Sequence, residues 1–120
     1  MQGMIKSMDN AIYLNVGGVY FVTRRSTLSQ SNSFFVGAIQ SNGDDVELFV
    51  DRDPTHFRYI LNWIRGSRVL PEDESTLQEL LVEADYYSLS TMVDAIKRTH
   101  NRYSIHRAIQ GIYNEVRQGR

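Results

Sequence analysis

The sequence predicts an α+β fold in which an N-terminal β-hairpin and a third strand pack with a cluster of about five helices. Two observations carry this prediction. Residues 11–23 form two β-branched and aromatic runs hinged on a Gly-Gly pair, which is typical of paired strands. After residue 53, apolar residues recur three and four positions apart, which is typical of amphipathic helices. With 120 residues, 42% of them hydrophobic, the chain has the size of one ordinary domain.

The first part of the chain is expected to supply the sheet. Gly17-Gly18 provides the positive φ angles of a tight hairpin turn, so strands should lie on both sides of it. A phosphate-binding loop would need further glycines and a Lys-Ser/Thr pair, and neither follows here. Residues 46–50, VELFV, are predicted as the third strand. Residues 33–39, SFFVGAI, are predicted as a short buried helix that Asn32 or Ser33 caps.

Residues 49–57, FVDRDPTHF, are predicted to join the third strand to a helix over 54–65. Asp53 suits the N-cap position and proline the first helical position. A catalytic pair of Asp51 and Asp53 is the alternative, but Arg52 would neutralise a neighbouring carboxyl group instead of raising its pKa. No His, Ser or Lys constellation stands nearby, so the chain is predicted to be non-enzymatic and to need no cofactor. The helix carries a single apolar stripe, made of Phe57, Ile60, Leu61 and Ile64.

Three further helices are predicted. A capping box of Thr76 and Glu79 precedes the apolar residues of the first, and Ser90 caps a short second helix that packs on it. Ser104 caps the third, a C-terminal helix over 100–120. That helix carries an apolar stripe made of Ile105, Ile109, Ile112 and Val116.

Charge is segregated along the chain, although the formal net charge is only −1. Residues 44–94 hold twelve acidic and four basic side chains, a net −8, whereas residues 95–120 hold six basic and one acidic, a net +5. Segregated charge steers association, so the basic tail and the acidic surface are expected to meet each other or separate partners. Cysteine is absent and no run of about 20 apolar residues occurs, which favours a cytoplasmic or nuclear protein without a membrane span.

The motifs LNVGGVYFVTRRSTL (14–28), FVDRDPTHFRYILNWIRG (49–66) and LLVEADYYSL (80–89) resemble the BTB/POZ domain of the potassium-channel tetramerisation type. The resemblance is closest to its non-channel relatives, the KCTD proteins. It implies a BTB domain over 11–99, preceded by an N-terminal extension over 1–10. Many channel domains share a zinc site built from one histidine and several cysteines, which a chain without cysteine lacks.

The resemblance also implies the site residues. Neighbouring subunits of this family pack side by side in a ring, and the residues of this chain that match such contacts are Asn15, Asp51, Arg52 and Asp53. In related BTB domains the region of the short helix after the hairpin helps contact cullin-3. The candidates for such a partner surface are Phe34, Phe35, Tyr59 and Trp63. Tyr59 and Trp63 share a helix face, so ordinary core packing is the competing interpretation, and the favoured one.

The function implied is homo-oligomerisation into four or five subunits, with the KCTD resemblance favouring five. The resemblance also implies a role as scaffold or adaptor for a cullin-3 ubiquitin ligase. The C-terminal helix then recruits a partner or packs on its own ring. One alternative is the cytoplasmic tetramerisation domain of a voltage-gated potassium channel. Another is nucleic-acid binding by the basic tail, against which the net charge of −1 argues.

Overall fold

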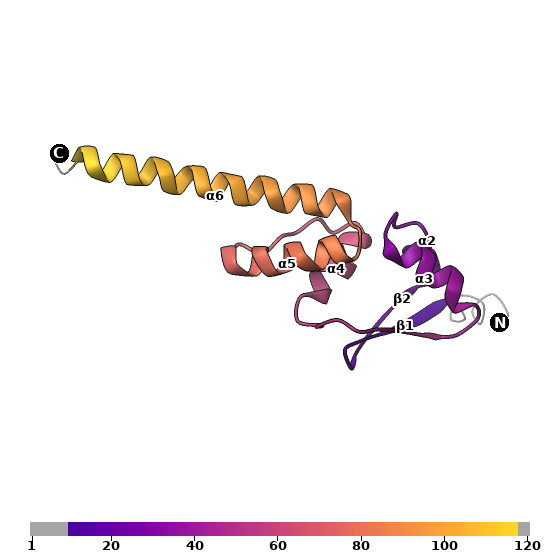
Figure 1. Cartoon of the computed structure of the whole chain (residues 1–120). Helices are drawn as coiled ribbons and strands as arrows, with labels where there is room; N and C mark the ends of the chain where they lie inside the picture. The colour runs from indigo at the N-terminus through magenta and orange to yellow at the C-terminus, as the bar shows by residue number, and fades with distance from the viewer. Residues whose placement is uncertain (1–9, 118–120) are drawn as a thin grey trace.

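The computed structural model of the chain describes residues 10–117. In this range helices cover one side of a small sheet, and the last helix extends away from the rest of the molecule (Figure 1). The strands are β1 (Ala11–Val16), β2 (Val19–Arg24) and β3 (Glu47–Val50). The helices are α2 (Arg25–Ser29), α3 (Phe34–Asn42), α4 (Phe57–Ile64), α5 (Glu74–Tyr86) and α6 (Ser90–Arg117). The predicted α+β class is therefore confirmed.

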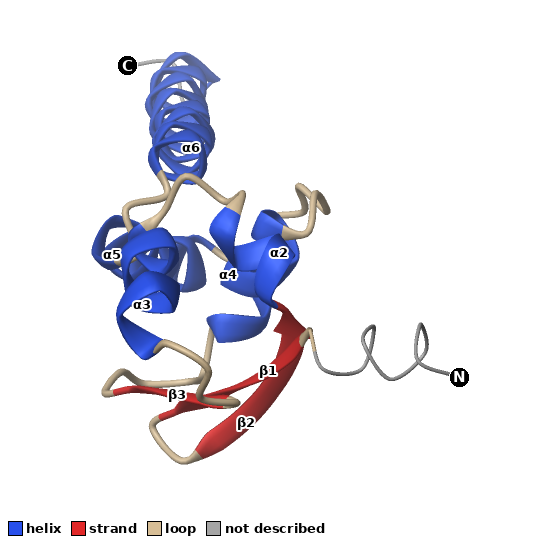
Figure 2. Cartoon of the chain, turned by 90° about the vertical axis from the view of Figure 1, so that its right-hand side faces the viewer, coloured by secondary structure: helices blue, strands red, loops and turns tan. Residues whose placement is uncertain are grey.

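The strands form one sheet in the order β2-β1-β3. β1 and β2 pair antiparallel as the predicted hairpin, and both residues of Gly17-Gly18 have positive φ angles, 56° and 100°. β3 pairs parallel with β1, and the chain reaches it through α2 and α3. Alternate residues of a strand point to opposite faces, so Ile12, Leu14 and Val16 are buried under the helices. Within residues 10–117, no helix lies on the other face of the sheet (Figure 2).

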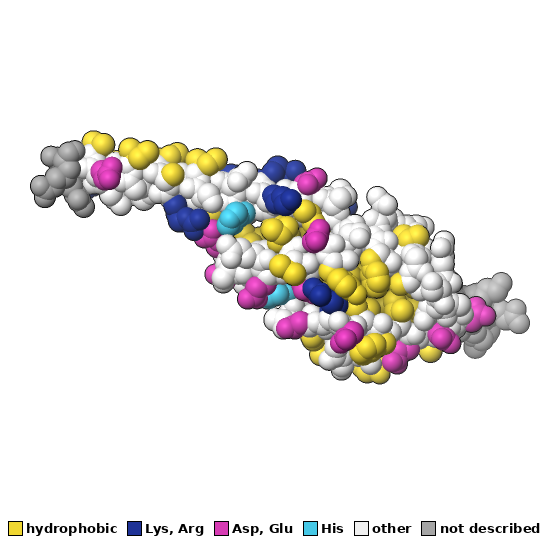
Figure 3. Space-filling view, viewed as in Figure 1, with side chains coloured by type: hydrophobic (Ala, Val, Ile, Leu, Met, Phe, Trp, Pro, Cys, Tyr) yellow, Lys and Arg dark blue, Asp and Glu magenta, His cyan; other side chains and the backbone are white. Residues whose placement is uncertain are grey.

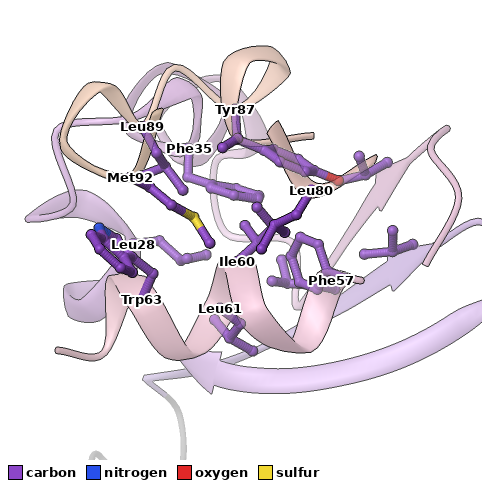
Figure 4. Packing of buried hydrophobic residues seen from close by; sticks show 14 of the residues in the cluster. Leu28, Phe35, Phe57, Ile60, Leu61, Trp63, Leu80, Tyr87, Leu89 and Met92 are labelled. Carbon is purple, nitrogen blue, oxygen red and sulfur yellow. The ribbon is translucent and has the colours of Figure 1, made fainter. Parts of the chain in front are cut away.

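The hydrophobic core lies between the inner face of the sheet and helices α3, α4, α5 and the first part of α6. Aromatic rings form its centre. The Phe35 ring stacks on the Tyr87 ring with centroids 5.2 Å apart, and the Phe57 ring meets Tyr87 edge-on at 5.4 Å. Figure 4 shows aliphatic side chains filling the space around these rings, among them Leu28, Ile60, Leu80 and Met92. Ser33 caps α3, as one of the two predicted alternatives, by accepting a hydrogen bond from the Phe35 N–H.

The predicted start of α4 is wrong. The helix begins at Phe57, and the backbone before it forms a turn in which the Phe57 N–H donates to the Pro54 carbonyl at 3.0 Å. Asp53 closes this turn, because its carboxylate accepts hydrogen bonds from the Thr55 N–H at 2.9 Å and the Thr55 hydroxyl at 2.5 Å. Asp53 thus accepts a hydrogen bond from a backbone N–H, as predicted, but it is not the N-cap of α4.

The predicted capping box of α5 is also wrong. The N-cap is Asp73, whose carboxylate accepts a hydrogen bond from the Thr76 N–H at 2.9 Å. The Ser75 hydroxyl and the Thr76 hydroxyl and N–H lower the pKa of Asp73. Glu79, the predicted partner in the box, instead contacts the His56 ring at 2.7 Å and so links α5 to the turn before α4.

A single helix, α6, replaces the two predicted C-terminal helices, so Ser104 lies inside it and caps nothing. It has 28 residues, and residues 97–104 contain no glycine or proline that would end it. The helix packs along α5, where the Tyr103 hydroxyl donates to the Glu72 carbonyl at 3.0 Å, and its far end gives the molecule an extent of 75 Å. Across residues 10–117 every helix is too short or too polar to cross a lipid bilayer. Residues 1–9 of the predicted extension and residues 118–120 lie outside the described range.

Candidate self-association and partner surfaces

The face of the sheet that the helices leave uncovered is rich in large apolar side chains. Tyr13, Tyr20, Val22 and Phe49 point outward from the three strands and are between 46% and 60% exposed. The register places Tyr13 opposite Val22, and Asn15 between Tyr20 and Phe49. We define the outer sheet face as Tyr13, Asn15, Tyr20, Val22, Glu47 and Phe49. Apolar groups clustered on one exposed surface are typical of a protein contact site.

Asn15 orders the polar groups of the outer sheet face. Its side-chain carbonyl accepts a hydrogen bond from the Gly18 N–H at 2.8 Å, which fixes the hairpin turn. Its side-chain amide lies 3.3 Å from the Tyr20 hydroxyl and 3.5 Å from the Glu47 carboxylate. A hydrogen bond from the Tyr20 hydroxyl to the Glu47 carboxylate, together with the negative charge of Glu47, raises the pKa of that hydroxyl. The surface therefore combines exposed rings with oriented polar groups, the mixture that protein interfaces use.

Arg52 points away from the outer sheet face and towards α5. Its guanidinium donates two hydrogen bonds to the Glu83 carboxylate, at 3.2 Å and 2.6 Å, and lies 4.2 Å from the centre of the Tyr86 ring. The hydrogen bond that the Arg52 guanidinium donates to Glu83 is the main reason that the pKa of Arg52 is raised. A bidentate pair fixes both position and orientation, so Arg52 holds the segment after β3 against α5.

Two of the four partner-surface candidates are buried, so the expectation that they form a surface is wrong for them. Phe35 is 0% exposed and Trp63 is 5% exposed. The Trp63 N–H donates to the Thr91 hydroxyl of α6 at 3.1 Å, which confirms the favoured packing interpretation for this residue. Phe34 and Tyr59 are half-buried, and they line separate hollows of the surface. The structure thus does not bring the four residues together.

The predicted stripe on the C-terminal helix is exposed. Ile105, Ile109, Ile112 and Val116 are each at least 59% exposed. They form a row along the far half of α6, which Figure 3 shows as a line of hydrophobic side chains on the side away from the domain. The described part of the chain, residues 10–117, leaves this row uncovered.

A family model described as the BTB/POZ domain matches residues 12–98. The chain belongs to the BTB/POZ domain family. The matched range starts in β1 and ends in α6, so it contains the whole sheet and the core helices. The part of α6 that carries the exposed stripe lies beyond the matched range.

Curated relatives confirm the KCTD-like character of this BTB/POZ domain. It is 37% identical over 97 residues to the human BTB/POZ domain-containing protein KCTD21 and 28% identical over 99 residues to human KCTD5. It is also 36% identical over 99 residues to the FH protein interacting protein FIP2 of Arabidopsis thaliana. These alignments cover 75–76% of the chain but only 33–42% of the relatives. The chain therefore spans well under half the length of these relatives.

The BTB/POZ structure separates the four predicted interface residues into two groups. Asn15 lies on the outer sheet face, and Asp51 is exposed directly after the end of β3. Arg52 is engaged with Glu83, and Asp53 closes the turn before α4. Self-association through any of them stays a prediction.

Sequence reasoning missed the apolar members of the outer sheet face. The signal was present, because Tyr13 in β1, Tyr20 and Val22 in β2, and Phe49 in β3 each alternate with residues that point into the core. A strand with apolar residues on both faces is expected to be covered on both faces. Helices of residues 10–117 cover only one face of this sheet, so the apolar alternation makes the other face a candidate contact surface.

Proposed function

We propose that this BTB/POZ domain is a non-enzymatic self-association module that assembles into a closed ring of four or five copies, with its KCTD relatives favouring five. The observation that carries the proposal is the outer sheet face, on which four large apolar side chains are 46–60% exposed in the single chain. Leaving such a surface in water costs free energy that contact with a second copy recovers. A ring needs a heterologous contact, in which this face meets a different surface of the neighbouring copy.

The geometry of the acidic residues supports a binding role over catalysis. Hydrogen bonds from Thr55 to Asp53 lower the pKa of that carboxyl group, whereas a general acid needs a raised pKa. Asp51 is exposed, and Arg52 between them is held by Glu83. Asp53 and Arg52 therefore build the turn and its contact with α5, and Asp51 presents a carboxylate to solvent.

Replacing Phe49 with aspartate is expected to convert the oligomer to monomer. Phe49 is 60% exposed, so its change leaves the core intact while placing a charge within the proposed contact. An unpaired charge buried in an interface is strongly unfavourable. The native mass measured by light scattering after size exclusion should fall to one chain, while circular dichroism should show an unchanged fold.

Val69→Asp is the matched control, because Val69 is 65% exposed and lies outside the outer sheet face. The same chemical change there should leave the native mass at the wild-type value. A folded Phe49→Asp variant with the wild-type mass would remove the outer sheet face from the assembly contact.

We extend this proposal to an adaptor role in which each copy of the ring presents a surface for cullin-3, so that several weak contacts act together. Phe34 and Tyr59, both half-buried, are the candidates that remain for this surface, since Phe35 and Trp63 lie in the core. Titration of the cullin-3 N-terminal region against the wild-type chain tests the role directly. Binding that Phe34→Ala or Tyr59→Ala weakens would support it, and no binding by the intact ring would exclude it.

A further inference from the structure

The exposed stripe of α6 lies on the side of the helix opposite to its own domain. The side that faces the domain carries Met92 and Ile96 in the core, Tyr103 hydrogen-bonded to Glu72, and Arg107 paired with Glu74. An α-helix turns by about 100° per residue, which places Ile109 and the rest of the stripe roughly half a turn away from these residues. Folding the tail back onto its own domain therefore does not cover the stripe.

The spacing of the stripe is that of a coiled-coil seam. Ile105, Ile109, Ile112 and Val116 are separated by four, three and four residues, which is the alternation of heptad positions d and a. β-branched side chains at both positions, as here, favour bundles of more than two helices. The preceding d and a positions hold Arg98 and Arg102, so the apolar seam begins only at Ile105. There α6 passes the N-terminal end of α5 (Figure 1).

A ring of identical copies would meet the geometric needs of such a bundle. Rotational symmetry makes every copy of α6 point the same way along the axis with the same register. Parallel, in-register helices are the arrangement in which equivalent d and a residues meet in layers. The seam is short, about two heptads, and isolated helices of that length are marginal in water, so a platform that holds the copies together is required.

The charges of the residues on and beside the stripe argue against a contact between the stripe and an acidic surface of a neighbouring copy. Arg107, the basic residue within the span of the stripe, points to the opposite side of α6 and is already paired with Glu74 of its own α5. The positions that flank the seam, at e and g of the heptad, are His106, Ala108, Tyr113 and Glu115. An apolar row with one acidic flank fits a second apolar row better than it fits an acidic surface.

We infer that the C-terminal halves of α6 from neighbouring copies form a parallel helical bundle through Ile105, Ile109, Ile112 and Val116. This inference rests on the proposed ring and adds to it a second contact, remote from the outer sheet face. The bundle would clamp the copies of the BTB/POZ domain together and carry whatever follows α6 along the axis of the assembly.

Single-cysteine variants of the full chain test the bundle, because the natural sequence contains no cysteine. Ile112→Cys places the only thiol in the proposed seam, whereas Asn114→Cys places it on the opposite, outward side of the same helix. Each variant is treated with a short bismaleimide cross-linker, over a dilution series, and its native mass is measured in parallel. Ile112→Cys should cross-link to covalent dimers at every dilution at which the ring persists, and Asn114→Cys should not.

The native mass separates the failure of this inference from the failure of the proposed function. A ring in which neither variant cross-links, or in which both do so equally, overturns the bundle and leaves the stripe to a helix of another protein. A monomer that does not cross-link overturns both. A chain that cross-links at Ile112→Cys only when concentrated, with no fixed larger mass, overturns the ring and with it the symmetric bundle.

Discussion

Replacing Phe35 with alanine is expected to lower the free energy of unfolding by about 3–5 kcal/mol, since truncating a buried phenylalanine removes its contacts and leaves a cavity. The Phe35 side chain is 0% exposed and contacts three other rings: Phe34 edge-on at 4.9 Å, Tyr87 in a stacked geometry and Phe57 edge-on at 6.1 Å. These rings come from α3, α4 and the end of α5, so the loss loosens three elements at once. Denaturant unfolding at one fixed protein concentration measures the change, because assembly adds to apparent stability.

Phe34→Ala is the matched comparison for Phe35→Ala. Phe34 is half-buried, and its ring lies against Tyr86 and Tyr87 with centroids 5.6 Å and 5.7 Å away. Its truncation should therefore cost clearly less stability than that of Phe35. If Phe35→Ala instead unfolded like the wild type, the placement of Phe35 at the centre of the core would be wrong.

Replacing Gly17 with alanine is expected to lower the free energy of unfolding by about 2–4 kcal/mol, from backbone strain and steric overlap together. Gly17 has a φ of 56°, in the left-handed region that side chains disfavour. A Cβ there would stand 2.4 Å from the carbonyl oxygen of Arg52, far inside contact distance. The Gly17 N–H also donates to the Val50 carbonyl at 3.0 Å, so the hairpin turn cannot move away without losing that bond.

Gly18→Ala separates the two causes. Gly18 is the neighbouring residue of the same turn and also has a positive φ, 100°, but a Cβ there meets no atom within 4 Å. Its replacement should cost only the backbone strain, about 1–2 kcal/mol. Equal losses in the two variants, measured by the same denaturant titration, would contradict the close approach of the hairpin turn to the segment after β3.

Local patterns were sufficient to predict the elements of the sheet and most of the core. The Gly17-Gly18 pair predicts the hairpin because few other residues adopt its backbone angles, and the spacing of Phe57, Ile60 and Leu61 predicts the buried side of α4. Ile64, the fourth member of that stripe, is half-buried, and Trp63 takes the buried place instead. The reason is a tertiary contact, the hydrogen bond to Thr91, which helical periodicity does not contain.

The two predicted C-terminal helices show a different limit. The apolar residues change phase between Tyr103 and Ile105, and a change of phase can mean either a break or a change of face. Because α6 continues without a break, its first half packs on α5 while its second half turns its apolar residues outward. Likewise, Arg52 was predicted as an interface residue because the charge pattern does not reveal that Glu83, 31 residues later, binds it.

The central claim is that the chain assembles into a closed ring, and the native mass of the purified chain across a concentration series tests it most directly. The account predicts a fixed mass of four or five chains that persists on dilution, with five favoured. In a closed ring both contact surfaces of every copy are occupied, so a copy leaves only by breaking two contacts. A monomer, or a dimer that dissociates on dilution, would contradict the account.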